Sequence, residues 1–261
     1  MRVTKNFERW SPFVLLAIVL LLWQAIVSGL GIAEFIFPSP WQIALQFIEF
    51  QGPLLDAAWK TFWVTMLGFG LSIVVGVLLG FLVGSSRLVY TALYPLLVAF
   101  NAVPKAAIVP ILVVWFGIGL GPGILTAFLI SFFPIVVNVA TGIATVEPEL
   151  KDVLRALGAR PRDIILKVGL PRAMPYFFAS LKIAVTVAFV GAIIAESVAP
   201  NAGIGRLMMV ASSRFDVPLV FAGLITTGLM GIVLYWIAEI IERRTTGWAT
   251  RGTDQHLAAG G

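Results

Sequence analysis

The sequence predicts an all-α, polytopic membrane protein with about six transmembrane helices and a charged loop on one side of the membrane. Apolar residues make up 59% of the 261 positions, whereas charged residues make up only 12%. A soluble domain carries roughly 25% charged residues, because its surface must meet water. The sequence is therefore expected to form a single membrane domain over residues 1–261.

Six apolar stretches are long enough to cross a bilayer, whose core of about 30 Å needs about 20 helical residues. They cover residues 12–30, 57–84, 91–117, 123–145, 176–198 and 218–241. The first stretch follows Arg2, Lys5 and Arg9 and has two interpretations, a cleavable signal peptide or a retained helix. Its long apolar core and the lack of a clear cleavage site favour the retained helix.

Lys and Arg are distributed unevenly between the two sides of these spans. One side holds both termini and thirteen basic residues: Arg2, Lys5, Arg9, Arg87, Lys151, Arg155, Arg160, Arg162, Lys167, Arg172, Arg243, Arg244 and Arg251. The opposite side holds Lys60, Arg206 and Arg214. Cytoplasmic loops carry the excess of positive charge, so both termini are expected in the cytoplasm. The same pattern accounts for the net charge of +5 without a nucleic-acid partner.

Two segments on the outer side are longer than turns. In residues 41–50, apolar side chains alternate with Gln and Glu, which fits either a short helix on the outer face or a loop folded back onto the bundle. Residues 199–216 are rich in Gly, and Gly203-Ile204-Gly205 predicts a tight turn. Residues 245–261 are expected to form a flexible tail.

The charged loop at residues 146–175 predicts two short amphipathic helices. Pro148 suits a first helical turn. Four apolar residues then share one face at helical spacing: Leu150, Val153, Leu154 and Leu157. Gly158 is expected to end this helix, and Pro161 to begin a second one that ends at Leu170-Pro171.

This helix pair has two interpretations. In the first, the apolar face packs on the cytoplasmic ends of the spans and the charged faces are available to a partner protein. In the second, the pair is a connector that lies on anionic lipid headgroups.

The loop resembles the EAA motif of ABC importer permeases: Glu-Ala-Ala, three residues, Gly, nine residues, Ile, one residue, Leu-Pro. The matching residues are Asp152-Val153-Leu154, Gly158, Val168 and Leu170-Pro171. The spacing matches throughout, although Asp replaces Glu and Val-Leu replaces the two Ala. In that family the loop is the coupling helix that docks into the ATPase. The resemblance implies a coupling role for Asp152, Val153, Leu154, Arg155, Gly158, Ala159, Leu170 and Pro171.

Further stretches resemble the nitrate, taurine and sulfonate branch of these permeases. They are Pro38-Ser39-Pro40, residues 104–117 ending in Trp115-Phe116-Gly117, Phe133-Pro134 with Asn138, and Glu196-Ser197 followed by Gly203-Ile204-Gly205. The resemblance implies a type I ABC importer in the bacterial inner membrane. It also implies a homodimer of this subunit in membrane lipid, two ATPase subunits, and a periplasmic or lipid-anchored solute-binding protein.

The chain itself is expected to be non-catalytic and to bind no metal or cofactor. It has no Cys, a single His256 and no Gly-Lys pair from which a phosphate-binding loop could be built. ATP and Mg²⁺ are therefore expected in the partner ATPase.

Four of the polar residues within the predicted spans have more than one interpretation or a specific expected position. Lys105 follows Pro104 in a span expected to be broken by prolines, and it either lines the translocation path or reaches the cytoplasmic interface. Glu196 either gates the outer mouth, pairs with Lys105 or is solvated. Asn138 is a further path candidate, or it bonds to a neighbouring helix. Lys182 is expected to extend to the cytoplasmic interface.

The predicted function is uptake of a small solute by alternating access. The branch resemblance and Lys105 favour an organic or inorganic anion such as a sulfonate, taurine or nitrate. A neutral or aromatic solute, such as a pyrimidine vitamin precursor, is the alternative. The rival classes are an ion-gradient-driven secondary transporter or channel, which gives no reason for the charged loop, and a non-transporting scaffold, which leaves the proline-broken third span unexplained.

Overall fold

The computed structural model describes residues 2–144, 148–199 and 202–258, and their regular structure is helical. In chain order the elements are α1 (Arg2–Gly29), α2 (Pro40–Glu49), α3 (Gln51–Ser85), α4 (Arg87–Ala102), α5 (Lys105–Phe116), α6 (Leu120–Ala144), α7 (Pro148–Ala156), α8 (Pro161–Ile164), the π-helical turn η1 (Ile165–Gly169), α9 (Leu170–Val198), α10 (Ile204–Ser213) and α11 (Val217–Ala258).

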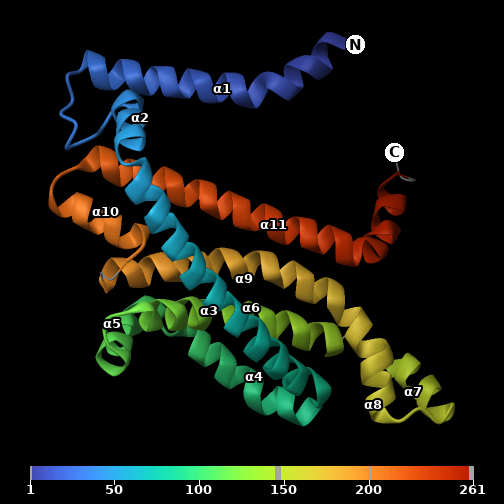
Figure 1. The fold of residues 1–261 in the computed structure, drawn as a ribbon. Coiled ribbons are helices and arrows are strands. Elements are labelled where there is room, and N and C mark those ends of the chain that lie inside the picture. The colour runs from blue at the N-terminus through green and yellow to red at the C-terminus, as the bar shows by residue number, and fades with distance from the viewer. Residues whose placement is uncertain (1, 145–147, 200–201, 259–261) are drawn as a thin grey trace.

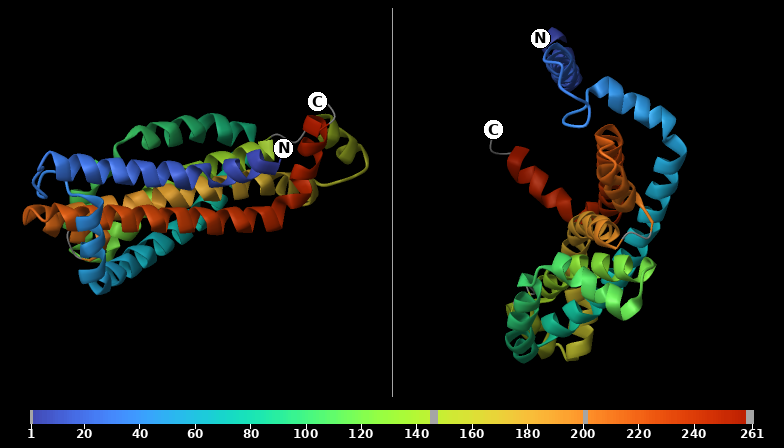
Figure 2. Two further views of the ribbon diagram at one scale, coloured as in Figure 1. Left: turned by 90° about the horizontal axis from the view of Figure 1, so that it is seen from above. Right: turned by 90° about the vertical axis from the view of Figure 1, so that its left-hand side faces the viewer.

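The long helices run side by side and define two ends of a bundle (Figure 1). Both termini, α7 and α8 lie at one end, which we call the coupling end. The helices α2, α5 and α10 lie at the opposite end, which we call the outer end. The view from above in Figure 2 separates the same elements in the same way. Termini at one end agree with the even number of crossings that the sequence predicts.

The predicted all-α polytopic fold is confirmed. Within the described residues, five helices are long and apolar enough to cross a membrane, namely α1, α3, α6, α9 and α11, and the bent α4–α5 pair makes a sixth when it is counted as one span. Several helices extend beyond their predicted spans: α3, for example, begins at Gln51, and α11 stays helical to Ala258, through the segment expected to be a flexible tail. Charged residues at these ends pair along the helix, Lys60 with Asp56 at 2.5 Å and Arg243 with Glu239 at 2.7 Å.

The third span is broken, as its prolines predict. The α4 and α5 helices meet at an angle of 86°. Val103 between them is extended, with φ −66° and ψ 128°. A residue before proline is pushed out of the helical region by the proline ring, and Pro104 has no N–H to continue the ladder. The chain therefore turns sharply at this position.

The core of the bundle is formed by α3, α6 and α9. The face of α3 toward α6 carries a small residue every fourth position: Gly68, Ser72, Gly76, Gly80 and Gly84. A Cβ at Gly76 would lie 2.8 Å from Ile135 Cβ, so the two backbones approach closely. The Ser72 and Ser131 hydroxyls share a hydrogen bond of 2.6 Å across this contact. Small residues and interhelical hydroxyls are the usual means of helix association in lipid.

The outer end is capped by α2 and α10, which are both helices. Ser39 and Gln42 form a capping box at the start of α2, and Ile43 packs in a cluster with Leu54 of α3 and Leu219 of α11. The segment 41–50 is thus a helix that also packs on the bundle. The segment around Gly203 is not merely a turn, because it leads directly into α10.

The helix α1 lies apart from the rest and is joined to it through α2 (Figure 2). Most of the described α1 side chains are exposed, including Phe13, Leu15 and Leu21. The link to the outer end runs through Trp23, whose Nε1 donates to the Pro38 carbonyl at 3.1 Å. An exposed apolar helix of this length is suited to contact with lipid.

Candidate functional site

The helix α7 ends as the sequence predicts. Gly158 has φ +81°, which an L side chain rarely adopts. Its N–H donates to the Arg155 carbonyl at 2.9 Å, and the Ala159 N–H donates to the Leu154 carbonyl at 2.9 Å. These two bonds form a Schellman motif, which satisfies the last carbonyls of the helix. The glycine thus fixes the length of α7 and the direction in which the chain leaves it.

The apolar stripe of α7 is only partly covered: Leu154 is half-buried, whereas two other members of the stripe are open to solvent. Val153 is 56% exposed and Leu157 is 78% exposed. Within the described residues, α7 contacts chiefly the short α8, and Figure 1 shows it projecting from the bundle. The Leu150 side chain lies outside the described residues. The surface offered at the coupling end is therefore apolar as well as charged.

The charged face of α7 is also open to solvent. Arg155 Nη1 pairs with Asp152 Oδ1 at 3.2 Å, three residues apart on the same helix. Both side chains are mostly exposed, so the pair contributes little to folding. Both faces of α7 are thus available to another molecule.

The predicted end of the second helix at Leu170-Pro171 is wrong. The short α8 runs into η1, which continues directly into α9, and Pro171 lies in the first turn of α9. A proline inside a continuous α-helix displaces the carbonyl four residues earlier. The wider π turn, Ile165–Gly169, relieves that conflict. The second helix of the loop and the fifth span are therefore one continuous rod, and the apolar span begins at Lys167 rather than at residue 176.

The base of this rod is fixed against α6 by two small residues. A Cβ at Gly142 would lie 2.7 Å from Ala173 Cα, and Ala173 is 2% exposed. Sequence reasoning missed this contact because Gly and Ala are common throughout the spans. Only the pairing of the two helices shows that these positions meet.

Lys105 is the first residue of α5, directly after the break. Its Nζ donates to the Asn101 carbonyl and, at 3.0 Å, to Asn101 Oδ1, and it lies 5.9 Å from the Phe100 ring centroid. A lysine at this position satisfies carbonyls at the C-terminal end of α4. Lys105 is only partly buried and belongs to the end of the bundle opposite α7.

Asn138 makes a local contact within α6. Its Nδ2 donates to the Pro134 carbonyl at 2.8 Å, one turn earlier on the same helix. This contact lies within α6 and is therefore not the predicted bond to a neighbouring helix. The side chain is partly buried.

Glu196 is buried, with 6% of its surface exposed, so it is not a solvated end residue. Its Oε2 accepts hydrogen bonds from the Gly205 N–H at 3.1 Å and from Thr61 Oγ1 at 2.9 Å. Thr61 Oγ1 in turn accepts from the Ile204 N–H at 2.9 Å. The first two N–H groups of α10 are thus satisfied by side chains from α9 and α3.

Gly203 makes this arrangement possible. Its φ is +96°, and a Cβ there would overlap the Glu196 carboxyl group. Thr61 and Glu196 are separated by 135 positions, so no local pattern could have shown their contact. Lys105 bonds to Asn101, whereas Glu196 bonds to Thr61 and Gly205, so the structure does not join Lys105 and Glu196 as a pair.

The predicted site residues therefore fall into two groups. The eight coupling residues lie in α7, at its cap and at the start of α9, all near the coupling end. Glu196 and Lys105 belong to the outer half. Among the described residues, no group of three or more His, Cys, Asp or Glu side chains is arranged to hold a metal ion.

The chain matches a family model described as "Binding-protein-dependent transport system inner membrane component" over residues 72–247. It is 34% identical to the riboflavin transport system permease protein RibX of Chloroflexus aurantiacus, covering 95% of this chain and 94% of that protein. It is 29% identical to the formylaminopyrimidine transport permease protein ThiX of Halalkalibacterium halodurans, covering 94% and 98%. It is 30% identical to the putative aliphatic sulfonates transport permease protein SsuC of Bacillus subtilis, covering 94% and 89%.

The fold is similar to that of a solved methionine ABC transporter, MetNI, in inward-facing conformations. The TM-score is 0.66 at 20% identity, over 75% of this chain and 97% of that one. The solved structure supports the fold alone, whereas the family match extends through the coupling loop, α9 and α11. The chain belongs to the binding-protein-dependent transport system inner membrane components, the permease subunits of ABC importers.

Proposed function

We propose that two copies of this chain form the membrane pore of an importer driven by a separate ATPase, with α7 as the contact to that ATPase. The observation that carries the proposal is the apolar face of α7, with Val153 and Leu157 exposed on a helix that projects from the bundle. Apolar side chains on a projecting helix gain free energy by entering a groove of a partner protein.

The continuity of the loop with α9 supports a mechanism of coupling. When ATP closes the two ATPase subunits, α7 is carried with them. Because α8, η1 and α9 follow one another without a break, the displacement passes into a membrane span rather than into a flexible linker. The close Gly142–Ala173 contact gives a pivot at the base of the rod. Repeated displacement switches the path between inward-facing and outward-facing states.

The charge distribution supports the orientation. Both termini and the α7–α8 loop share the end that carries the basic residues, which is the cytoplasmic side by the positive-inside rule. In this orientation α7 meets a cytoplasmic ATPase. ATP and its Mg²⁺ bind to that ATPase, and this chain contributes no catalytic residue.

A recess at the outer end suits the solute-binding protein. It has a volume of about 390 Å³ and lies between the start of α3, α10 and the start of α11. Its lining includes the basic residues of the outer side, Lys60, Arg206 and Arg214, together with Asp56 and Asp216. Because Glu196 and Thr61 fix the start of α10, the recess is preorganised for a polar partner surface.

The solute is proposed to be a small anion such as a sulfonate, taurine or nitrate. The relative named for aliphatic sulfonates and the cationic Lys105 at the broken span support this class. A neutral or aromatic solute is the second candidate, because two relatives are named for riboflavin and formylaminopyrimidine.

The first test is purification of the tagged chain from native membranes in mild detergent, with mass spectrometry of the proteins that remain bound. We expect an ATPase with a phosphate-binding Gly-Lys loop and a solute-binding protein. The wild-type complex in liposomes should then take up solute only when ATP is present. Isolation of this chain alone, together with uptake that follows an ion gradient, would contradict the proposal.

A further inference from the structure

A partly buried ion pair joins α9 to α11 near the end of the apolar part of α11. Lys182 Nζ lies 2.5 Å from Glu242 Oε2, and the two side chains are only 24% and 20% exposed. The sequence predicts that Lys182 extends to the cytoplasmic interface but does not show a partner for it. The lysine reaches sideways to a carboxylate on the neighbouring span, 60 positions later in the chain.

The pair lies close to the coupling machinery. Lys182 follows Leu170, the first residue of α9, by twelve positions, which is about 18 Å along a helix. Glu242 lies near the end of the apolar part of α11, which runs from Val217 to Thr245. The pair therefore joins α9 to α11 beyond the Gly142–Ala173 contact, through which the base of α9 meets α6.

The low exposure of Lys182 and Glu242 makes the strength of their ion pair depend on the distance between the two side chains. Little water reaches two side chains that are three-quarters covered, so their attraction is screened less than that of a surface pair. Removal of one partner leaves a charge in an apolar environment, which is strongly unfavourable. The two helices consequently resist any movement that separates Lys182 from Glu242.

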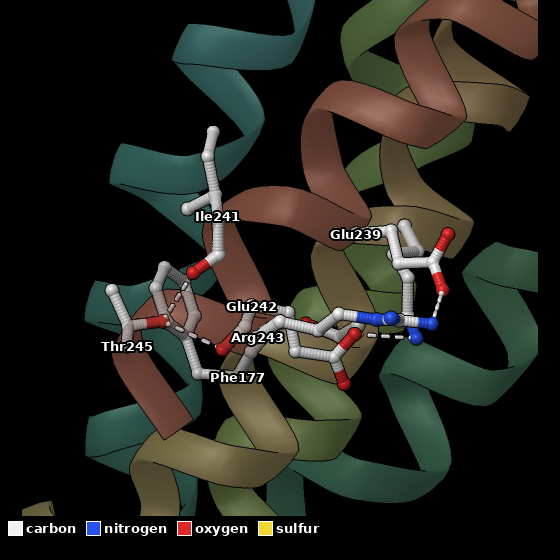
Figure 3. A network of polar contacts seen from close by, with 8 residues as sticks. Phe177, Glu239, Ile241, Glu242, Arg243 and Thr245 are labelled. Carbon is white, nitrogen blue, oxygen red and sulfur yellow. Dashed lines mark hydrogen bonds and ion pairs between the residues drawn. The ribbon is translucent and has the colours of Figure 1, made fainter. Parts of the chain in front are cut away.

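A second ion pair on α11 provides a natural control. Arg243 Nη2 pairs with Glu239 Oε1 at 2.7 Å, four residues away on the same helix, and Arg243 is 78% exposed. Figure 3 shows Glu239 and Arg243 beside Glu242, with Phe177 of α9 close by. The neighbouring pair has the same chemistry but does not link two helices.

We propose that Lys182 and Glu242 are positioning residues for transport, whose ion pair fastens α9 to α11 so that displacement of α7 moves both spans as one unit. The inference rests on the proposed coupling role of α7. The α9 helix receives the displacement directly, and the pair extends it to α11, which otherwise has no continuity with the loop.

The test compares variants in the full complex, reconstituted in liposomes with its ATPase and binding protein. Solute uptake and ATP hydrolysis are measured in the same vesicles. We expect Lys182→Gln and Glu242→Gln each to lower the solute taken up per ATP by about tenfold while hydrolysis continues. The charge-exchanged double variant, Lys182→Glu with Glu242→Lys, should recover most of the wild-type ratio. The control Arg243→Gln should keep the wild-type amount of solute taken up per ATP.

Several results would overturn the inference. An unchanged ratio of uptake to hydrolysis in both single variants would do so, and so would a double variant no better than the single ones. A ratio that stays constant while thermal stability falls would show a structural role only. A wild-type complex without ATP-dependent uptake would instead contradict the proposed function on which the inference rests.

A second measurement needs no change to the ion pair. Because the chain has no Cys, spin labels can be attached at two introduced cysteines, Tyr176→Cys on α9 and Arg244→Cys on α11. We expect the distance between these labels to be the same in the nucleotide-free and ATP-bound complexes. Labels on α9 and at Ser85→Cys, the end of α3, should change their separation. A change in the α9–α11 distance between the two states would contradict the inference.

Discussion

The two ends of the helix bundle differ in how their short helices are completed. At the outer end, α10 receives its N-terminal hydrogen bonds from Thr61 and Glu196, and α2 begins with its own capping box. At the coupling end, α7 satisfies its last carbonyls through Gly158, but its apolar side chains remain exposed. The outer end is thus complete within the chain, whereas the coupling end lacks a partner for its apolar face.

This difference shows that the type of a residue does not reveal whether its side chain is buried or exposed in this protein. Polar residues such as Thr61 and Glu196 lie in the interior and stabilise the fold, although polar side chains in a membrane helix suggest a transport path. Apolar residues such as Val153 and Leu157 are exposed, although their spacing suggests a packed core. Substitutions at the two ends should therefore affect different quantities.

The largest effect is expected at the coupling end. The double substitution Val153→Asp with Leu157→Asp places two charges on the face offered to the ATPase. We expect binding of the ATPase to weaken by about 3 kcal/mol, roughly a hundredfold, because central apolar contacts contribute most to an interface. The thermal stability of the purified chain should stay within about 0.5 kcal/mol, since both side chains are already exposed.

The matched control is Val153→Ile with Leu157→Met, which keeps the apolar face at similar volume and should keep ATPase binding. Titration of the ATPase against the chain in nanodiscs measures the ATPase affinity of both double variants. Equal ATPase affinity for the Asp and Ile/Met variants would contradict the assignment of this face.

An intermediate effect is expected at the outer end. Glu196→Ala leaves the buried Gly205 N–H without its acceptor, whereas Thr61 Oγ1 can still donate to the Ala57 carbonyl at 3.1 Å. We expect the stability of the chain to fall by about 2 kcal/mol. ATPase binding should remain as in the wild type, because α7 lies at the other end of the bundle.

Glu196→Gln is the matched control, because its side-chain oxygen still accepts from Gly205 and Thr61. It should retain more of the stability than Glu196→Ala in thermal unfolding monitored in the same detergent. If Glu196→Ala were as stable as the wild type, the capping role at the start of α10 would be wrong.

The sequence was sufficient wherever the determinant is local. The six crossings follow from apolar length, the break at Pro104 from the stereochemistry of proline, and the end of α7 from a glycine at positive φ. The small side chains that recur at every fourth position from Gly68 to Gly84 are a pattern of the same local kind. These features depend on a few consecutive residues.

The features that were missed depend on how helices meet. The contacts Thr61–Glu196, Lys182–Glu242 and Gly142–Ala173 each join different spans, so their members are far apart in the chain. The continuity of the loop with α9 was missed because Pro171 normally ends a helix, and a π turn is needed to accommodate it. Which face of α7 is exposed depends on how α7 lies relative to the other helices, which the sequence of α7 alone does not determine.

The smallest effect is expected at Lys105, which belongs to the outer half but is only partly buried. Lys105→Met removes a positive charge near the break while keeping a flexible side chain. We expect uptake of taurine, an alkanesulfonate or nitrate, whichever the wild-type complex accepts, to fall by about fivefold, or about 1 kcal/mol, because the charge is partly screened. Lys105→Arg should keep most of the uptake, since it preserves the charge. A neutral solute such as riboflavin should be insensitive to both changes. If Lys105→Met transports the anion as well as the wild type does, then Lys105 serves the C-terminal end of α4 through Asn101, and the outer end contributes to the fold alone.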